Sequence, residues 1–459
     1  MATAPWFVLS PNGLLSAIGL LRGPDRTTPT PAEDWRTAVV DVVIPAYKEE
    51  DNIVHCLASL ARQTKRPRHV ILVDDGARDQ TVPRAREYAA AVGLDLIVFE
   101  RAASIGKTPT IKRQAREFDS DVEFILDGDT FLQSTNYIER CVQELYQGVG
   151  IASACGIILP MRPGNRHALS QTPEFQRWHG AQTYDDPHAR RGRLHSLWWW
   201  ITNTYRECLY TFLQRFVYKG QMAFFGGITN PVGCAVAYRR RYIKDLFDRY
   251  EPLFGDDLTN SEDIFIGFAL NSAGYRNIQL QDVLAHSEEP EVQRLPRQIY
   301  LWSSSFLQSC YYFDSMLRTP LRALRRWRKN RSDKASGVEK QRKIQEQYRQ
   351  PFGEQHTVRY GRPIGWAMFL SAVEKIGFPT ALLIMLILRM WSALLVTLIA
   401  EVLVSLAVLV LVARGDRLGM LGKGLLVTPI RYVMIAAETV TLARFGFDLW
   451  VTGNRKWRK

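Results

Sequence analysis

Short apolar runs alternate with stretches of helical periodicity from about residue 38 to residue 290. The first helical stretch places Ile53, Leu57 and Leu60 at the spacing of one helix face. Four apolar runs read as strands: VVDVVIPAY, HVILVDDG, LDLIVFE and VEFILDGD. Nearly continuous apolar strands between amphipathic helices are typical of a mostly parallel sheet covered on both faces. The pattern therefore predicts an α/β fold.

Three of the predicted strands end in polar and acidic residues. These ends read PAYKEE, DDGARD and DGDT. One such end, Asp127-Gly128-Asp129, would suit an ordinary turn from strand to loop. Parallel sheets, however, bind ligands beyond the carboxyl ends of their strands. Three ends of this kind therefore predict a ligand site along this edge of the sheet.

Asp127 and Asp129 can share a divalent ion, because one small residue separates them. Such an ion bridges a diphosphate and neutralises the leaving group. Carboxylate oxygens suit Mg²⁺ or Mn²⁺, and no cluster of His and Cys argues for zinc. A sugar transfer also needs a base for the acceptor hydroxyl, and Glu262-Asp263 offers one. The alternative is structural: Ser261 caps a helix, and both acids favour its dipole.

The chain becomes strongly apolar from Ile364 onward. Two runs each match the ~20 residues that a membrane-crossing helix needs: IGWAMFLSAVEKIGFPTALLIMLILRM and WSALLVTLIAEVLVSLAVLVLVA. Charged side chains are costly inside a bilayer, so Glu374, Lys375 and Glu401 are expected to face other helices or an interface. The pattern predicts a multi-pass membrane protein, with the lipid bilayer as a partner.

Basic segments flank the apolar runs. RTPLRALRRWRKNRSDK precedes the first run, RGDR follows the second, and GNRKWRK ends the chain. The positive-inside rule places all three on the cytoplasmic side. This orientation predicts a cytoplasmic (inner or plasma) membrane protein whose catalytic domain faces the cytoplasm. To keep the basic tail on that side, residues 418–451 should form a helical pair, or an interfacial piece with irregular crossings.

The N-terminal segment WFVLSPNGLLSAIGLL is short, and Pro11 and Gly13 interrupt it. It predicts an interfacial helix or a marginal span, and it lacks the charged n-region and cleavage site of a removable signal peptide. The expected division of the chain is therefore an N-terminal interfacial or membrane segment, a catalytic domain, amphipathic and basic interface helices, and a transmembrane region. These parts cover residues 1–37, 38–292, 293–362 and 363–459.

Composition excludes bulk disorder and points to an anionic partner. The 459 residues are 46% hydrophobic and 23% charged, with a formal net charge of +13. A phosphate-bearing substrate, a membrane surface or nucleic acid would each fit this charge. The predicted topology explains most of it, so nucleic acid is not required. The six cysteines are far apart without a CxxC pair, which indicates core residues of a reducing compartment.

Two common nucleotide-binding motifs do not fit the sequence. SIGKTPT contains a GKT, but Arg101 occupies the position where a P-loop needs its first glycine. No GxGxxG follows the first predicted strand, which disfavours a dinucleotide-binding fold.

Taken in order, VVIPAYKEE, VDDGARDQT, GK, DGD, SED and a Gln…Trp element resemble the family 2 inverting glycosyltransferases. Within this family, the match is to membrane-embedded processive enzymes similar to hyaluronan, chitin-oligosaccharide and cellulose synthases. The resemblance covers about residues 39 to 302, together with the layout of membrane helices. It implies a GT-A fold, a nucleotide-diphosphate sugar donor, and metal-dependent inversion at the anomeric carbon.

The resemblance also implies roles for single residues of this chain. Those implied to bind the nucleotide sugar are Tyr47, Glu49, Asp75, Lys107 and Asp127. Those implied to bind metal are Asp127, Asp129 and His286. Asp263 would be the general base with Glu262 beside it, and Gly233 and Cys234 would let the acceptor sugar approach the backbone. Lys107 is also readable as an exposed loop lysine, and His286 as a structural histidine.

The sequence departs from the family pattern in two places, and the second of them bears on donor binding and processivity. Ala77 stands where the family has serine, and the family's QxxRW motif is incomplete. QIYLW keeps Gln298 and Trp302 but has Leu301 in place of arginine, whereas QRLPRQ keeps Gln293 and Arg297 without the tryptophan. The first alignment is preferred, because Pro296 suits a first helical turn and the two motif residues then share a face.

Arg297 or Arg294 is expected to supply the missing cation, so that Arg297, Gln298 and Trp302 join the substrate-binding set. The tryptophans of SLWWWITNTY could stack on sugar rings or form an interfacial belt, and these two readings stay open.

The leading hypothesis is a membrane glycosyltransferase that uses Mg²⁺ or Mn²⁺ to add sugars from a UDP-sugar to a growing polysaccharide and moves the product across the membrane. The first alternative is transfer of a single sugar to a lipid carrier or glycolipid. The alternative of another class is a catalytically degenerate membrane scaffold, against which the retained DxD and ED argue. The expected partners are the UDP-sugar donor, a saccharide or glycolipid acceptor and the bilayer, with homo-oligomers and export partners left open.

Overall fold

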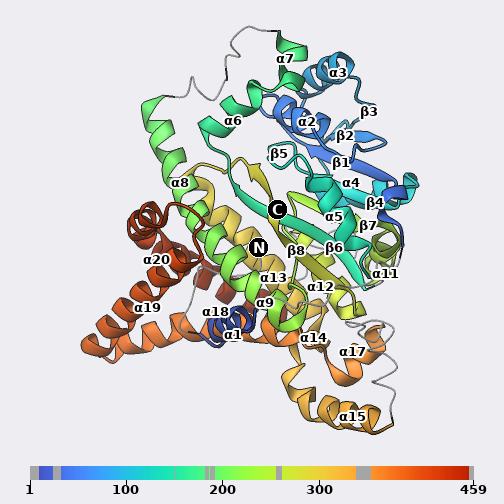
Figure 1. Ribbon diagram of the computed structural model, residues 1–459. Helices are drawn as coiled ribbons and strands as arrows, with labels where there is room; N and C mark the ends of the chain where they lie inside the picture. Colours follow the sequence, from blue (N-terminus) through green and yellow to red (C-terminus); the bar gives the residue numbers. More distant parts are fainter. Residues whose placement is uncertain are drawn as a thin grey trace.

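A twisted, eight-stranded sheet forms the centre of the protein in the computed structural model (Figure 1). The structure describes residues 10–23, 33–148, 150–180, 186, 192–254, 261–336 and 353–453. The strand order within this part of the chain is β3-β2-β1-β4-β7-β6-β8-β5. Helices cover the sheet, and three long apolar helices extend from its flank.

The first half of the sheet has the predicted alternation of strands and helices. Its strands are β1 (Val40–Ala46), β2 (Val70–Asp74), β3 (Leu96–Glu100) and β4 (Val122–Leu126). Neighbours pair in parallel, so each connection crosses the sheet through a helix: α2 (Ile53–Ala61), α3 (Thr81–Val92) or α4 (Lys107–Glu117). Because both faces are covered, β1, β2 and β4 are almost entirely buried.

The second half of the sheet mixes both directions. It consists of β5 (Thr130–Leu132), β6 (Ile151–Pro160), β7 (Ala235–Arg239) and β8 (Arg276–Ser287). β7 runs antiparallel to β4, and β5 pairs antiparallel with β8, so that Thr130 lies opposite Ser287. This register brings the Asp127–Asp129 turn beside the residues that follow β8.

The remaining helices pack around this sheet. Those of the body are α5 (Tyr137–Leu145), α6 (Pro163–Ser170), α7 (Pro173–His179), α8 (Arg193–Phe212), α9 (Lys219–Phe225), α10 (Arg240–Ile243), α11 (Leu246–Phe254), α12 (Glu262–Ala273) and α13 (Leu295–Tyr312). α8 continues through a π-helical turn, η3 (Leu213–Tyr218), into α9. Short elements complete this part of the chain: η1 (Trp35–Thr37), η4 (Val292–Arg294), α14 (Asp314–Leu317), η5 (Pro320–Arg322), α15 (Ala323–Ala335) and α17 (Glu354–Tyr360).

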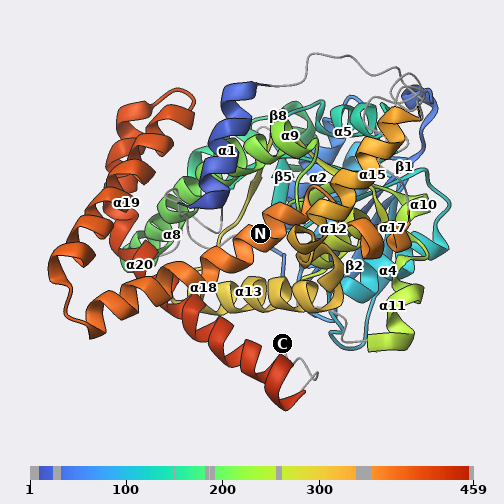
Figure 2. The same cartoon turned by 90° about the horizontal axis from the view of Figure 1, so that it is seen from below.

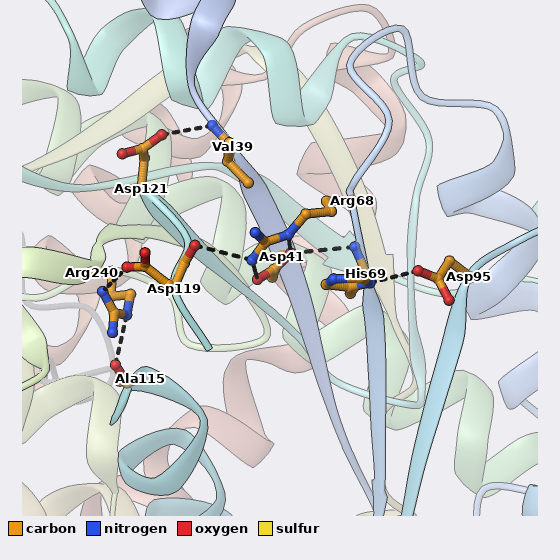
Figure 3. A network of polar contacts seen from close by, with 9 residues as sticks. All are labelled: Val39, Asp41, Arg68, His69, Asp95, Ala115, Asp119, Asp121 and Arg240. Atoms are coloured by element: carbon orange, nitrogen blue, oxygen red, sulfur yellow. Dashed lines mark hydrogen bonds and ion pairs between the residues drawn. The ribbon is translucent and has the colours of Figure 1, made fainter. Parts of the chain in front are cut away.

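A polar network ties the loops together at the amino ends of β1 and β2 (Figure 3). Arg68 donates to both carboxylate oxygens of Asp41, at 3.0 and 2.5 Å. Arg240 pairs with Asp119 at 3.0 Å, and Asp121 accepts the backbone N–H of Val39 at 2.8 Å. The acidic residues of this edge are therefore used for structure, in contrast to those at the opposite edge.

Three described helices are long and apolar enough to cross a membrane. They are α18 (Gly365–Ile387), α19 (Trp391–Val412) and α20 (Arg417–Phe447), which continues through η6 (Asp448–Thr452). Their mean hydropathies are 1.7, 2.8 and 1.4. Figure 2 shows α19 beside the first part of α20 and well away from the sheet. The two apolar runs predicted from the sequence are thus confirmed as helices.

The expectation for residues 418–451 is wrong. Neither a helical pair nor an interfacial piece with irregular crossings forms, because α20 and η6 make one uninterrupted helix of 36 residues. At 1.5 Å per residue its length is about 54 Å, well beyond the ~30 Å of a bilayer core. Part of this helix therefore packs on the protein body, mainly against α13 and α8.

The charged residues within these helices face other helices, as expected. Lys375 of α18 pairs with Glu438 of α20, and both side chains are buried. Glu401 of α19 pairs with Arg431 of α20, again with both side chains buried. The pairs connect α20 to both of its neighbours, and they explain how charged residues fit into apolar helices.

The N-terminal helix α1 (Pro11–Arg22) is docked on the body. Its Gly19 lies so close to Gly220 of α9 that an added Cβ would be 2.3 Å from the Gly220 carbonyl oxygen. The Asn12 backbone N–H donates to Glu374 of α18 at 2.5 Å. With 12 residues the helix is about 18 Å long, too short to span a bilayer. Residues 1–9 and 24–32 of the predicted N-terminal segment lie outside the described residues.

The six cysteines, all within the described residues, form no disulfide bonds, and five of them are buried. Their burial agrees with the prediction that they are core residues.

Candidate active site

The candidate active site lies at the carboxyl ends of β1, β2 and β4. Glu49 follows β1, Asp75 follows β2, and Asp127 follows β4. Antiparallel β7 reaches the same edge, where the Asp127 backbone N–H donates to the Cys234 carbonyl oxygen at 2.9 Å. The sheet topology therefore gathers the predicted strand-end residues and the Gly233–Cys234 segment at one place.

The Asp75 carboxylate is held by the loop that precedes α4. It pairs with Arg101 at 2.8 Å, and it accepts the backbone N–H groups of Ile105 and Gly106 at 3.0 and 2.9 Å and the Ser104 hydroxyl at 2.5 Å. Burial opposes ionisation, but these donors outweigh it and lower the pKa of Asp75. Asp75 is thus an ionised carboxylate that shapes the loop leading to Lys107.

Lys107 lies between two carboxylates from distant parts of the chain. Its Nζ is 2.6 Å from Asp127 Oδ1 and 2.7 Å from Glu262 Oε1, and it donates to the Gly233 carbonyl oxygen at 3.1 Å. Burial alone would lower the pKa of Lys107, but the two carboxylates raise it well above its usual range. The lysine is therefore an ionised cross-link at the centre of the site, and not an exposed loop lysine.

Asp263 lies in the first turn of α12, against the backbone of Gly233. A Cβ added at Gly233 would be 2.7 Å from Asp263 Cβ, so only glycine fits this approach. Asp263 Oδ1 accepts the Ile264 backbone N–H at 2.8 Å and also contacts the Ser261 hydroxyl. Ser261 is the N-cap residue of α12, but its side chain makes no capping hydrogen bond. The contacts of Asp263 within the described chain thus use Oδ1, and Oδ2 is the oxygen left to accept a proton.

A second group of carboxylates surrounds Asp129. The Asn52 side chain donates to Glu49 Oε2 at 2.9 Å and to Glu288 Oε2 at 2.7 Å, and the Glu288 backbone N–H donates to the Asp129 carbonyl oxygen at 3.1 Å. Burial and then the Asp129 charge raise the pKa of Glu49 to about 9. Burial and then Asp127 raise the pKa of Asp129 to about 8. These carboxylates repel one another, and a cation would relieve the repulsion.

The donor set at this edge fits a hard divalent cation. Among the described residues no three His, Cys, Asp or Glu side chains converge closely enough to hold a metal ion by themselves. A metal at Asp127 and Asp129 would therefore need further oxygen ligands from a substrate. Carboxylates supplemented by phosphate oxygens are the usual setting of Mg²⁺ and Mn²⁺. The predicted pair of aspartates thus fits such an ion together with a diphosphate.

His286 points away from this group, against its predicted metal role. Ser287 Oγ lies 3.5 Å from Asp129 Oδ1, and successive side chains of a strand point to opposite faces. The His286 ring packs on Phe131, and its Nδ1–H donates to the Pro160 carbonyl oxygen at 3.1 Å. Burial lowers the pKa of His286 to about 4. The structure thus supports the structural reading of this histidine.

Gln298 and Trp302 are half-buried on one face of α13, as their spacing predicts, and the cation that both contact comes from α8. The Arg206 guanidinium donates to the Gln298 side-chain oxygen and lies 4.4 Å from the centre of the Trp302 ring. Arg206 also pairs with Glu289 at 3.3 Å, and both side chains are buried. Arg294 and Arg297 are exposed on the surface. The expectation that one of these two supplies a cation to the diphosphate stays a prediction, whereas Arg206 is the cation that contacts Gln298 and Trp302.

The remaining predicted residues lie at the margin of the site. Tyr47 follows β1 and is 49% exposed. Cys234 is partly buried beside Asp127. Trp198, Trp199 and Trp200 lie in the first half of α8, where Trp200 is exposed. The stacking role and the interfacial role of these tryptophans both stay predictions.

Sequence reasoning missed Asn52, Arg206, Glu288 and Glu289. The two glutamates had a signal, because HSEEP follows a strand in the same way as the other acidic strand ends. Burial raises the pKa of Glu289 to about 7, although Arg206 opposes this. Arg206 had no signal, since its contacts join parts of the chain that are 83 to 96 residues apart.

Residues 41–247 match the sequence model of glycosyl transferase family 2. The matched residues lie in the α/β domain, whose mostly parallel, curled sheet is GT-A-like, as the resemblance implied. A stretch of 116 residues is 31% identical to the undecaprenyl-phosphate 4-deoxy-4-formamido-L-arabinose transferase of Pseudomonas fluorescens strain Pf0-1. That stretch covers 24% of this chain and 34% of the relative, so the chain spans about a third of the relative's length.

Two solved structures show a distant likeness. The mannosyltransferase PcManGT of Pyrobaculum calidifontis, in complex with GDP-Man and Mn²⁺, has 15% identity and a TM-score of 0.49, with 96% of this chain and 94% of that chain covered. The glucosyl-3-phosphoglycerate synthase of Mycobacterium tuberculosis, in complex with Mn²⁺, UDP and phosphoglyceric acid, has 16% identity and a TM-score of 0.34, with 66% and 83% covered. Neither likeness bears on the donor or acceptor of this protein.

Proposed function

We propose that the protein is a membrane-bound, metal-dependent glycosyltransferase that uses a UDP-sugar and inverts the anomeric carbon. The observation that carries this proposal is the Lys107 cross-link, which joins Asp127 of the DxD turn to Glu262 beside Asp263. A carboxylate suited to a metal and a carboxylate next to the one suited to proton transfer thus contact the same lysine. The match to the sequence model of glycosyl transferase family 2 covers most of the candidate active site and supports the assignment.

Asp127 and Asp129 would hold Mg²⁺ or Mn²⁺ against the donor diphosphate. The ion would neutralise the charge that develops on the departing nucleotide. Asp75 keeps the loop before α4 in place for the nucleotide, and Tyr47 and Glu49 lie beside it. Arg206, held by Gln298 and Trp302, is the buried cation on the α13 side of the cleft.

Asp263 would act as the general base. Its Oδ2 receives no hydrogen bond from the described residues, so a saccharide hydroxyl would approach this oxygen. The hydroxyl proton would move to Oδ2 as the oxygen attacks the anomeric carbon from the side opposite the diphosphate. Lys107 pairs with Glu262 and neutralises the charge of this glutamate. The glutamate would then not repel the negative charge that develops on the attacking hydroxyl oxygen. In-line attack of this kind inverts the anomeric configuration.

We infer that the acceptor is lipid-linked and receives a single sugar. The name of the curated relative, which acts with undecaprenyl phosphate, supports this alternative over a polymer. Leu301, in place of the arginine of processive enzymes, points the same way. A growing polysaccharide stays the second candidate, because Gln298 and Trp302 are kept on α13.

The membrane arrangement follows from the candidate spans. We propose a multi-pass protein in the cytoplasmic (inner or plasma) membrane, with the catalytic domain of residues 38–292 facing the cytoplasm and residues 363–459 in the membrane. Residues 293–362 would connect the two at the interface, and residues 1–37 would add the docked helix α1. The basic segments before α18 and between α19 and α20 support this orientation.

A donor and acceptor panel tests the proposal. Purified protein is incubated with Mg²⁺ or Mn²⁺, single UDP-sugars, and either polyprenyl phosphate or an oligosaccharide primer. We expect release of UDP and one labelled sugar in the lipid extract. Material that elongates on a gel would establish the polymerase instead. If the folded protein releases nucleotide from none of the donors, it is not an active transferase, and the catalytically degenerate scaffold is the remaining alternative.

A further inference from the structure

Helix α15 carries an exposed face that combines arginines with large apolar side chains. Residues 321–335 include seven Lys or Arg and one acidic residue. Leu321, Leu324 and Trp327 are 83%, 57% and 55% exposed. Arg328 and Arg331 are exposed on the same side of the helix, one turn apart, and the Arg331 guanidinium lies 5.5 Å from the centre of the Trp327 ring. Neither the catalytic site nor the core uses these side chains.

The other side of α15 is fixed to the protein. Lys329, which also pairs with Asp333 of the same helix, lies 5.4 Å from the centre of the Tyr360 ring of α17. Arg322, just before α15, donates to the backbone oxygens of Ser315 and Thr357 at 2.7 and 3.2 Å. The exposed face therefore has a defined direction and cannot turn inward to bury its apolar groups.

The start of α15 is attached to the start of the first candidate span. Thr319 lies four residues before α15, and its hydroxyl accepts the Arg362 backbone N–H at 3.2 Å. Gly365, the first residue of α18, lies so close that an added Cβ would be 2.2 Å from the Thr319 hydroxyl. The end of a membrane span lies at the level of the lipid headgroups. The segment before α15 is therefore held at the start of α18, and Figure 1 shows α15 below the sheet.

We propose that the outer face of η5 and α15, formed by Leu321, Leu324, Trp327, Arg328 and Arg331, docks on an anionic lipid surface. Arginines attract acidic headgroups, and leucine and tryptophan insert at the boundary between headgroups and acyl chains. A nucleic-acid partner would explain the charge but not the exposed leucines or the position at the start of α18. The proposal depends on α18 entering a membrane and is independent of sugar transfer.

Hydrogen exchange of the full-length protein in nanodiscs tests this docking. Exchange of the amides of residues 323–335 is compared in POPC discs and in mixed POPC/POPG discs. Each basic residue at an anionic surface contributes about 5-fold in affinity, so we expect exchange to slow by at least about 5-fold in the POPG discs. Arg328→Glu/Arg331→Glu should abolish the slowing, and Trp327→Ala should reduce it.

The matched control is Arg36→Glu/Arg66→Glu, which reverses two exposed arginines near the amino ends of β1 and β2. This control should keep the full slowing, because it makes the same charge change away from α15. Unchanged exchange of the β1 and β4 amides in every variant shows that the fold persists. Equal exchange of α15 in both discs would overturn the proposal. The proposal would also be overturned if an added oligonucleotide slowed the exchange of α15 and POPG did not.

Discussion

At the scale of single residues, the contact between Gly233 and Asp263 fixes the position of the proposed base. Gly233→Ala would place a Cβ 2.7 Å from Asp263 Cβ, which α12 can accommodate only by shifting. Misplacing a catalytic group by about 1 Å costs ~100-fold in rate, so we expect kcat to fall by about that factor. Steady-state kinetics measure this, and circular dichroism checks the fold.

Gly164→Ala is the matched control, since a Cβ there meets nothing within 4 Å. It should leave kcat unchanged. A folded Gly233→Ala variant with normal kcat would mean that the exact place of Asp263 does not matter.

The raised pKa values in the cleft predict how stability depends on pH. The pKa is about 9 for Glu49, about 8 for Asp129 and about 7 for Glu289. A carboxyl group whose pKa is higher in the folded state stabilises the fold below its unfolded value, and this contribution is lost as pH rises through the folded pKa. The metal-free protein should therefore lose thermal stability from about pH 4.5, the ordinary pKa of a glutamate, to about pH 9.

Scanning calorimetry in EDTA and in Mn²⁺ checks this dependence. We expect Mn²⁺ to remove most of the loss, because it binds the ionised carboxylates, and Asp129→Asn to flatten the profile in EDTA. A melting temperature in EDTA that stays constant or rises over this range would contradict the assigned pKa shifts.

The residues show what sequence could and could not predict about the site. Asp127, Lys107 and Asp263 were found because strand ends and short motifs are local features of the chain. Arg206 was not found, since only the packing of α8 on α13 brings its guanidinium to Trp302. Likewise the strand register, which no local pattern encodes, turned His286 away from Asp129.

At the scale of elements, the length of the apolar runs predicted α18 and α19 correctly, whereas the prediction for residues 418–451 missed the single long helix α20. The expectation of a pair or an irregular segment rested on keeping the basic tail on the cytoplasmic side. Arg431 and Glu438 lie within the helix, whose mean hydropathy is 1.4. Both charges are paired inside the structure, so the helix continues through them. The pairing partners come from α18 and α19, and sequence alone did not connect them.

These ion pairs predict that the loss of one partner lowers stability, because the other charge then stays buried without its counter-ion. Arg431→Met would leave the buried Glu401 carboxylate with only its hydroxyl contacts to Ser405 and Tyr432, at 2.7 and 3.0 Å. Removing one partner of a buried pair costs about 3–5 kcal/mol. We expect a clear drop in melting temperature in detergent, measured by tryptophan fluorescence.

Adding Glu401→Gln to Arg431→Met should recover part of this loss, since the unpaired charge is then removed. Arg444→Met in the same helix is the control, because Arg444 is exposed and its loss should change little. If both single variants melt alike, the buried pair does not stabilise the helices.

At the scale of the whole molecule, α13 joins the catalytic cleft to the membrane helices. Gln298 and Trp302 on this helix contact Arg206, and one residue further Ser303 donates to Glu438 of α20 at 2.7 Å. Glu438 in turn pairs with Lys375 of α18. α13 thus contacts Arg206 on the catalytic side and, through Ser303, the ion pair that joins two candidate spans.

The central claim is that Asp129 serves the metal and donor while Asp263 serves the acceptor. The most direct measurement compares UDP affinity in Mn²⁺ with sugar transfer for Asp129→Asn, Asp263→Asn and the control Asp95→Asn, whose carboxylate pairs with His69 at the surface. We predict that Asp263→Asn keeps UDP affinity but loses at least ~100-fold in transfer. Asp129→Asn should lose Mn²⁺-dependent UDP affinity, and Asp95→Asn should change neither. Loss of UDP affinity alone in both Asp129→Asn and Asp263→Asn would contradict this division of roles.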